Sequence, residues 1–273
     1  MEPYTVLMSV YEKEVPEFFQ KSLESILKQT HAPSQIVVVK DGPLTEELDG
    51  VLETVTAKHP NLFTIVPLEE NVGLAGALNQ GLQYCKNSLI GRMDSDDIAL
   101  PERFFKQVGA MEHKGYELCS GTVLEFEEDP MHPVSKRILP ETKEEIIRFS
   151  KRRNPFNHPA VMFRKELVEA VGGYPSYPFF EDYALWMEIL ARDVPVGNLA
   201  EPLVYMRVGH QMYERRGGRS YVKKLWNFKK YLYQKGWMSW SDFVISAGGH
   251  VVIALLPKGL RKKFYERNLR GSI

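Results

Sequence analysis

Strand-like and helix-like runs alternate through the first third of this 273-residue chain, and this alternation constrains its fold more than any other feature. Four short apolar runs rich in branched residues predict buried strands, at residues 4–10, 35–39, 62–66 and 88–93. Helix-like runs lie between them, beginning at Pro16, near residue 46 and near residue 74. Strict alternation of this kind predicts βαβ units, and therefore an α/β fold with a mostly parallel sheet flanked by helices.

Polar residues follow three of the predicted strands. The strand ends read Ser9-Val10-Tyr11-Glu12, Lys40-Asp41-Gly42 and Asp94-Ser95-Asp96-Asp97. Ligands of open α/β sheets bind outside the carboxyl ends of the strands, so these three ends predict a single site. Three carboxylates within four positions repel one another, and a divalent cation would offset that repulsion.

The second half of the chain is less regular. Helices are expected near residues 101–114, 143–152, 165–171 and 181–192, strands at 118–126, 160–163 and 203–208, and a surface loop at 127–140. With 44% hydrophobic and 26% charged residues, the composition is typical of a soluble globular protein. Two cysteines give no disulfide framework, and the amino-terminal segment lacks the pattern of a secretory signal, so a cytoplasmic location is expected.

The charge is unevenly distributed along the chain. Residues 219–273 carry twelve Lys and Arg but only two acids, which gives them a strongly positive net charge. Residues 1–218 carry a negative net charge of the same size, because the whole chain has equal numbers of basic and acidic residues. We therefore expect a catalytic domain at 1–218 and a basic helical extension at 219–273. The apolar run 243–256 is too short to span a bilayer. It suits peripheral binding to an anionic membrane on its cytoplasmic face, and simple packing on the first domain is the alternative.

Several segments together resemble a known family: "VLMSVYEKE", "VVVKDG", "ENVGLAGALNQGL", "GRMDSDD", "NPFNHPAVMFR", "GGYPSYPFFEDYALWMEILARD" and "EPLVYMRVGHQMYERRGG". In this order they are similar to the inverting glycosyltransferases of family 2, in the bacterial exopolysaccharide branch of the amylovoran type. The resemblance runs from about residue 4 to residue 216. It implies the Rossmann-like GT-A fold and the transfer of one sugar from a nucleotide-sugar, usually a UDP-sugar.

The resemblance implies roles for particular positions. Nucleotide-sugar binding falls on Ser9, Val10, Tyr11, Glu12, Asp41, Asn71, Gly73, Asn79, Arg92, Asp94, Ser95, Arg215 and Arg216. Asp94 and Asp96 match the DXD motif, and Asp96 with His210 would hold Mn²⁺ or Mg²⁺. Asp182 matches the catalytic base. His158 and Glu181 would serve the acceptor or support the base, and Glu181 is the alternative choice for the base itself.

Simpler explanations exist for most of these residues. Asp96 or Asp97 can cap the following helix, and Asp182 can be an acid in the first turn of its own helix. His158 can be a structural histidine, Gly73 can serve a tight turn, and Arg215 and Arg216 can belong to a solvated loop. The chain also departs from the family, with Ser9 and Glu12 flanking the first tyrosine and Leu78 where an arginine is frequent.

The sequence thus predicts a metal-dependent inverting glycosyltransferase that acts on a saccharide or lipid-linked saccharide acceptor. It would lie on the inner face of the plasma membrane, and no nucleic acid partner is expected. A sugar-nucleotide pyrophosphorylase is one alternative, although "SVYEKE" lacks the glycine-rich loop that such enzymes place after the first strand. A non-catalytic protein that binds nucleotide-sugars or glycans is another alternative, and turnover of a UDP-sugar would separate the two classes.

Overall fold

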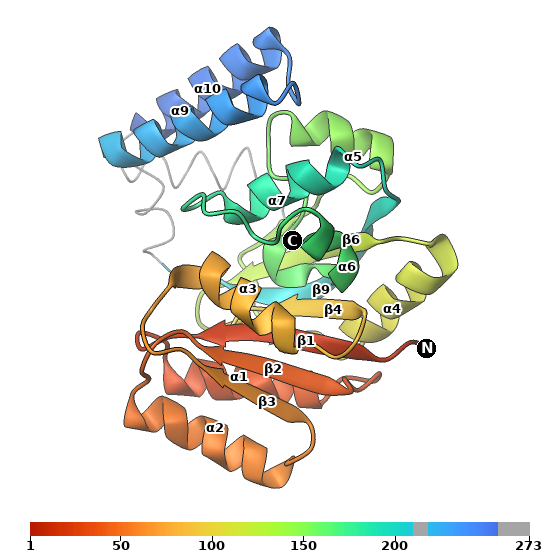
Figure 1. Cartoon of the computed structure of the whole chain (residues 1–273), viewed down its shortest axis with the longest axis vertical. Helices are drawn as coiled ribbons and strands as arrows, with labels where there is room; N and C mark the ends of the chain where they lie inside the picture. The colour runs from red at the N-terminus through yellow and green to blue at the C-terminus, as the bar shows by residue number, and fades with distance from the viewer. Residues whose placement is uncertain (210–217, 256–273) are drawn as a thin grey trace.

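The computed structural model describes residues 1–209 and 218–255. Its centre is a nine-stranded sheet in the order β3-β2-β1-β4-β8-β6-β9-β5, with β7 paired to β6 (Figure 1). The strands are β1 (Tyr4–Val10), β2 (Gln35–Lys40), β3 (Phe63–Pro67), β4 (Leu89–Met93), β5 (Ile98–Ala99), β6 (Leu118–Phe126), β7 (Ser135–Arg137), β8 (Met162–Arg164) and β9 (Val196–Arg207).

The first four long strands form the parallel part of the sheet. β1 pairs in parallel with β2 and β4, and β2 with β3. The remainder is mixed, because β8 runs antiparallel to β4 and β6, whereas β6 and β9 are parallel. The expected α/β sheet is confirmed, with its parallel pairing concentrated in the βαβ units that the sequence alternation predicts.

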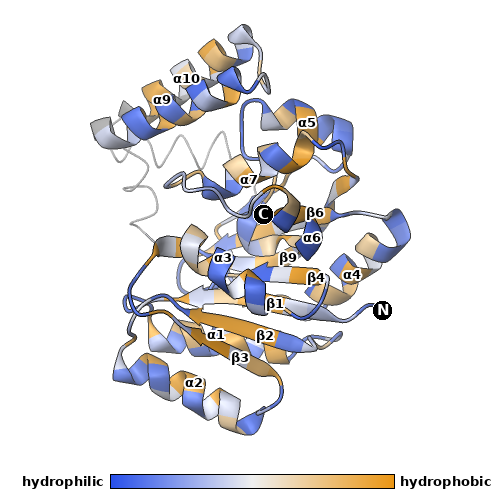
Figure 2. Cartoon of the chain, viewed as in Figure 1, coloured by the Kyte–Doolittle hydropathy of each residue, from blue (hydrophilic) through white to orange (hydrophobic). Residues whose placement is uncertain are grey.

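The helices cover both faces of the sheet. They are α1 (Pro16–Leu27), α2 (Glu46–Lys58), α3 (Gly73–Tyr84), α4 (Arg103–Lys114), α5 (Lys143–Ser150), α6 (Lys165–Ala170), α7 (Glu181–Leu190), α9 (Gly218–Gln234) and α10 (Trp240–Leu255), with a short 3-10 turn at His158–Ala160. One apolar core packs α1, α2 and α4 against the sheet, and a second packs α3, α5, α6, α7 and α9 on the other face. The strands between these cores are coloured hydrophobic in Figure 2.

Local sequence signals account for several helix boundaries. Pro16 begins α1, where its fixed φ suits the first helical position. The Thr45 hydroxyl caps α2 by accepting a hydrogen bond from the Leu48 N–H. α4 ends at Gly115, which has a φ of 66°. The region 127–140 contains the short strand β7, and the strand predicted at 203–208 begins earlier, at Val196.

The helices α9 and α10 lie side by side at the end of the molecule opposite α2 (Figure 1). Phe228 of α9 stacks on Phe180, with ring centroids 4.7 Å apart, and Leu225 and Leu232 are buried beside it. The described part of residues 219–273 therefore packs on the preceding part of the chain. No helix among the described residues is long and apolar enough to cross a bilayer. The basic end, residues 256–273, lies outside the described residues.

Candidate active site

A cavity of about 630 Å³ opens at the carboxyl ends of β1, β2 and β4. This is the place that the sheet rule predicts for a ligand site. Predicted residues that line it are Ser9, Tyr11, Asp41, Asn71, Gly73, Asp94, Ser95 and Asp96. The tertiary structure therefore brings together most of the residues assigned to the nucleotide-sugar.

Asp41 organises the loop that forms one wall of this cavity. One oxygen of its carboxylate accepts a hydrogen bond from the Val72 N–H at 2.7 Å, and the Asn71 amide donates to the Asp41 carbonyl at 3.2 Å. Gly73 has a φ of 78°, which only glycine adopts readily, so it allows the turn into α3. Burial raises the pKa of Asp41, and the backbone N–H donors oppose that shift.

Arg92 is buried and pairs with the first acid of the Asp-Ser-Asp motif. Its two terminal nitrogens contact both carboxylate oxygens of Asp94. A fork-to-carboxylate pair of this kind fixes the Asp94 side chain in one orientation. The positive charge of Arg92 is thus engaged with Asp94, and Arg92 itself is not among the residues that line the cavity.

The other two acids of the motif, Asp96 and Asp97, have raised pKa values. Burial, together with the nearby charges of Asp94 and Glu14, raises the pKa of Asp96 to about 7. Burial also raises the pKa of Asp97 well above its usual range. One Asp97 oxygen accepts a hydrogen bond from the Arg207 N–H at 2.7 Å. Asp97 therefore ties the motif to β9 and does not cap α4, which begins at Arg103.

Glu14 and Arg207 also line the cavity, although neither is among the residues predicted from the sequence. Glu14 accepts a hydrogen bond from the Ser95 hydroxyl. The Arg207 guanidinium lies over the Phe18 ring at 3.7 Å, and its Nε donates to the Asp96 carbonyl at 3.2 Å. Arg207 lies within the family segment "EPLVYMRVGHQMYERRGG", and its place in that segment is the feature of the sequence that points to a role in the site.

Asp182 lies in the first turn of α7 and is not among the residues that line the cavity. Its carboxylate accepts hydrogen bonds from the Asn154 amide at 2.6 Å and from the Tyr183 N–H at 2.7 Å. Burial raises the pKa of Asp182, while these donors and the charges of Arg137 and Arg92 oppose the shift. The local contacts fit a first-turn acid as well as a base, so helix position alone does not decide its role.

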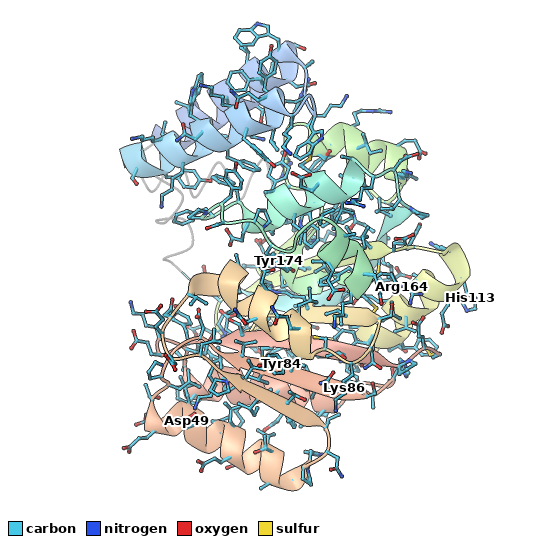
Figure 3. The ribbon with its side chains drawn as sticks, viewed as in Figure 1. Asp49, Tyr84, Lys86, His113, Arg164 and Tyr174 are labelled. Atoms are coloured by element: carbon cyan, nitrogen blue, oxygen red, sulfur yellow. The ribbon has the colours of Figure 1, made fainter. Side chains whose placement is uncertain are left out.

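His158 belongs to an aromatic group beside Asp182. Its Nε2 is 3.1 Å from the Tyr174 hydroxyl, and its ring meets Trp186 edge-on at 5.9 Å. Burial and the Arg92 charge lower the pKa of His158 well below its usual value, so the ring is neutral. Tyr174, labelled in Figure 3, lies between α3 and α7.

Some predicted residues do not line the cavity. Val10 is buried in the core, and Glu12 is exposed while Glu14 takes the cavity position. The Asn79 amide bonds both the N–H and the carbonyl of Tyr174, at 2.7 and 2.8 Å, which is a structural use of that side chain. His210, Arg215 and Arg216 lie outside the described residues.

Asp96 is the candidate metal ligand of the cavity among the described residues. In the part of the chain that the structure describes, no three His, Cys, Asp or Glu side chains converge as a complete metal centre. Mg²⁺ and Mn²⁺ accept oxygen ligands, and Mg²⁺ commonly takes one or two carboxylates and completes its shell with phosphates and water. Five acids line this cavity (Glu14, Asp41, Asp94, Asp96 and Glu127) against two cations (Lys13 and Arg207), and this excess of negative charge fits such a partial site.

Sequence comparisons identify relatives over nearly the whole chain. A sequence profile of Glycosyl transferase family 2 matches residues 5–172. The chain is 38% identical to the amylovoran biosynthesis glycosyltransferase AmsE of Erwinia amylovora, over 98% of this chain and 100% of that protein. It is 36% identical to the UDP-Gal:alpha-D-GlcNAc-diphosphoundecaprenol beta-1,3-galactosyltransferase of Escherichia coli, over 98% of this chain and 96% of that protein.

Structure comparisons find the GT-A fold. TarS 1-349 of S. aureus, in complex with UDP-GlcNAc, superposes with a TM-score of 0.64 at 16% identity, covering 96% of this chain and 70% of that one. The mannosyltransferase PcManGT of Pyrobaculum calidifontis, in complex with GDP-Man and Mn2+, also gives 0.64 at 16% identity, covering 100% of this chain and 76% of that one. On the family profile and these relatives, the chain belongs to glycosyl transferase family 2.

Proposed function

We propose that this protein transfers one sugar from a UDP-sugar to a hydroxyl of a saccharide that is carried on a lipid diphosphate, with inversion at the anomeric carbon. The observation that carries the proposal is the acidic cavity at the carboxyl ends of β1, β2 and β4, together with the buried Arg92, which pairs with Asp94 of that cavity and also acts on the pKa of Asp182 on α7. The Escherichia coli relative, which by its name uses UDP-Gal and a diphosphoundecaprenol-linked sugar, supports this choice of donor and acceptor.

The donor would occupy the cavity. Asp41 and Tyr11 would contact the nucleoside, since both come from the ends of adjacent strands. Asp94, held by Arg92, would face the ribose, and Asp96 would bind Mn²⁺ or Mg²⁺ on the diphosphate. When bound, the metal would neutralise charge on the departing diphosphate. His210, Arg215 and Arg216 remain candidates for the same diphosphate by resemblance.

The acceptor would approach Asp182 from the opposite side. Inverting transfer needs one base that takes the proton of the attacking hydroxyl, with the bond to the diphosphate breaking on the other face. The Asn154 amide and the Tyr183 N–H would hold the Asp182 carboxylate in place for that role. The neutral His158 ring and the Tyr174 hydroxyl could contact the acceptor sugar.

A surface formed by α9 and α10 would place the enzyme on the membrane that carries its acceptor. Trp226 and Trp240 are 47% and 63% exposed, and Ile245 and Val252 are 54% and 63% exposed. Aromatic residues at headgroup depth beside aliphatic residues and lysines are typical of interfacial binding. We therefore place the protein at the cytoplasmic face of the plasma membrane, as a peripheral protein.

Turnover of purified protein tests the proposal. We expect UDP release with only one of a panel of UDP-sugars, and only when a lipid-diphosphate-linked saccharide and Mn²⁺ are both present. Anomeric configuration of the product, read by NMR, should be inverted relative to the donor. If UDP binds but no sugar is transferred to any acceptor, the non-catalytic binding alternative would replace the proposal. Formation of a UDP-sugar and diphosphate from UTP and a sugar 1-phosphate would favour the pyrophosphorylase.

A further inference from the structure

A second cavity, of about 620 Å³, lies between α5 and the beginning of α10. Its lining includes four cations, Arg148, Lys151, Arg152 and Arg153, and two acids, Glu145 and Asp242. The cations thus exceed the acids by two. Positive clefts concentrate anions, and arginine is well suited to phosphate because its planar fork of N–H donors matches phosphate oxygens.

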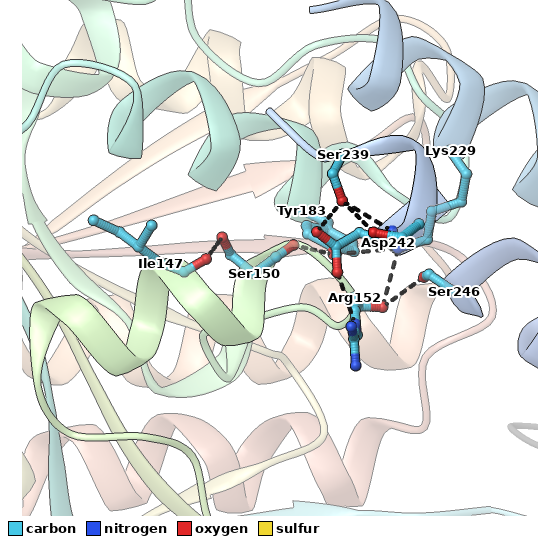
Figure 4. Close-up of polar contacts among 9 residues, drawn as sticks. Ile147, Ser150, Arg152, Tyr183, Lys229, Ser239, Asp242 and Ser246 are labelled. Carbon is cyan, nitrogen blue, oxygen red and sulfur yellow. Dashed lines mark hydrogen bonds and ion pairs between the residues drawn. The ribbon is translucent and has the colours of Figure 1, made fainter. Parts of the chain in front are cut away.

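The acids of this cleft already have partners. The Arg152 Nε lies 2.9 Å from an Asp242 oxygen, and the Ser239 hydroxyl donates to the other Asp242 oxygen at 2.7 Å (Figure 4). Glu145 accepts a hydrogen bond from the Thr142 hydroxyl at 3.1 Å, at the start of α5. The Asp242 charge is therefore balanced by Arg152, and three further cations line the same cleft.

The lining of the cleft and the residue that holds the predicted base belong to one short segment. Lys151, Arg152 and Arg153 line the cleft, and Asn154, the next residue, donates its amide to Asp182 at 2.6 Å. The segment 151–154 therefore contributes to the cleft and to the surroundings of Asp182.

An apolar surface begins at the other side of the cleft. Asp242 lies in the first turn of α10, and the same helix then exposes Val244, Ile245 and Val252. A cationic cleft and an apolar helix face thus share the beginning of α10. A diphosphate and an isoprenoid chain are joined in the same way in a polyisoprenyl-diphosphate sugar.

We propose that the cleft between α5 and α10 binds the diphosphate of a polyisoprenyl-diphosphate-linked acceptor, with the isoprenoid along the exposed face of α10 and the sugar toward Asp182. This inference rests on the proposed function for the identity of the acceptor, but it concerns a separate site from the donor cavity. Arg148 and Lys151 are the residues through which it is tested, because both line the cleft and neither has been placed in the catalytic machinery.

Farnesyl diphosphate is the probe, titrated into the full chain with the donor cavity saturated by UDP and Mn²⁺. The double variant Arg148→Gln/Lys151→Gln should bind it about 10- to 100-fold more weakly, because hydrogen bonds to charged groups are among the stronger ones in proteins. The control Lys58→Gln/Lys86→Gln removes the same charge elsewhere and should bind normally; Lys86 is labelled in Figure 3, far from α10. Farnesol should bind weakly to all three proteins.

A kinetic measurement separates the cleft from the active site. The Arg148→Gln/Lys151→Gln variant should raise KM for the diphosphate-linked acceptor and leave transfer to a simple alkyl glycoside of the same sugar unchanged. Equal affinity of the variant and the native chain for farnesyl diphosphate would overturn the proposal, and so would tight binding of farnesol. Because binding requires no sugar transfer, absence of turnover would count against the proposed function and not against the cleft.

Discussion

Lys229 of α9 donates a hydrogen bond to the hydroxyl of Tyr183 at 3.3 Å, and Tyr183 follows the predicted base Asp182 directly in the chain (Figure 4). The same ammonium group donates to the Arg152 carbonyl at 3.0 Å, and the Tyr183 hydroxyl donates to the Ser150 carbonyl. Lys229 is only 1% exposed. The side chain of the buried Lys229 therefore connects the carboxy-terminal helices to the helix that carries Asp182.

Because Lys229 is buried, we expect the free energy of unfolding to depend on pH. Burial lowers the pKa of Lys229 to about 7, below the value of about 10.4 in an unfolded chain. Between these values the unfolded state binds more protons, so this group adds stability as pH rises from about 7 toward 10. Lys229→Met should remove that rise, measured as the difference in melting temperature between the two proteins at pH 7 and pH 9. A constant difference would show that the ammonium is charged at both pH values.

Metal removal should abolish donor binding. We expect UDP to bind in isothermal titration with Mn²⁺ and to lose that binding in excess EDTA, because the acids around Asp96 lack enough positive charge. Asp96→Ala should behave like the EDTA sample in the presence of Mn²⁺, with the fold retained by circular dichroism.

Glu12→Ala is the matched control for Asp96→Ala, since Glu12 is exposed and does not line the cavity. It should bind UDP normally, whereas Glu14→Ala should change the affinity. Loss of UDP binding in Glu12→Ala would instead favour Glu12 as the nucleotide-binding residue, as the family resemblance implies. Full activity in EDTA would exclude the metal.

Asp182→Asn should keep UDP binding and lose sugar transfer by about 10²- to 10⁴-fold, the usual cost of removing a general base. Burial raises the pKa of Asp182, so transfer by the native protein should fall as pH decreases through that raised value. Single-turnover rates between pH 4.5 and 8 would measure this, with Glu181→Gln as the control. If Glu181→Gln loses the larger factor, the base is Glu181.

Binding to anionic vesicles should depend on the exposed face of α10. Ile245→Ser/Val252→Ser should reduce co-sedimentation with such vesicles at low salt, because both side chains are more than half exposed. Met131→Ser/Ile138→Ser changes two residues that are 73% and 54% exposed elsewhere, and should have no effect. Equal sedimentation of all three proteins, or none for the native chain, would contradict membrane binding. Truncation at Gly218 is unsuitable, since it would expose the partners of buried Phe228.

The sequence by itself determined the parallel part of the fold and the place of the donor site. Alternating runs predicted β1 to β4 with α1, α2 and α3 between them, because periodicity and chain punctuation are local properties. Asp41 and Asp94 each follow a strand, and the carboxyl ends of parallel strands lie at the same edge of a sheet. The sequence therefore predicted that these two residues lie at one edge of the sheet. Asp182 was predicted as the base only from the family resemblance. Its neighbouring residues in the sequence are equally consistent with an acid that stabilises the first turn of a helix.

Only the tertiary structure decided which contacts each acid of the Asp-Ser-Asp-Asp motif makes and where residues 219–255 pack. Asp97 bonds the β9 backbone at Arg207, 110 residues away, because strands distant in sequence become neighbours in the sheet. Arg92 pairs with Asp94, two residues along the chain, and this pair depends on the burial of Arg92, which packing decides. Asn79, expected at the donor, is instead bonded to Tyr174, 95 residues away. The charge count of residues 219–273 could not reveal that Lys229 is buried, because burial depends on which face of α9 meets α7, and only the packed structure selects that face.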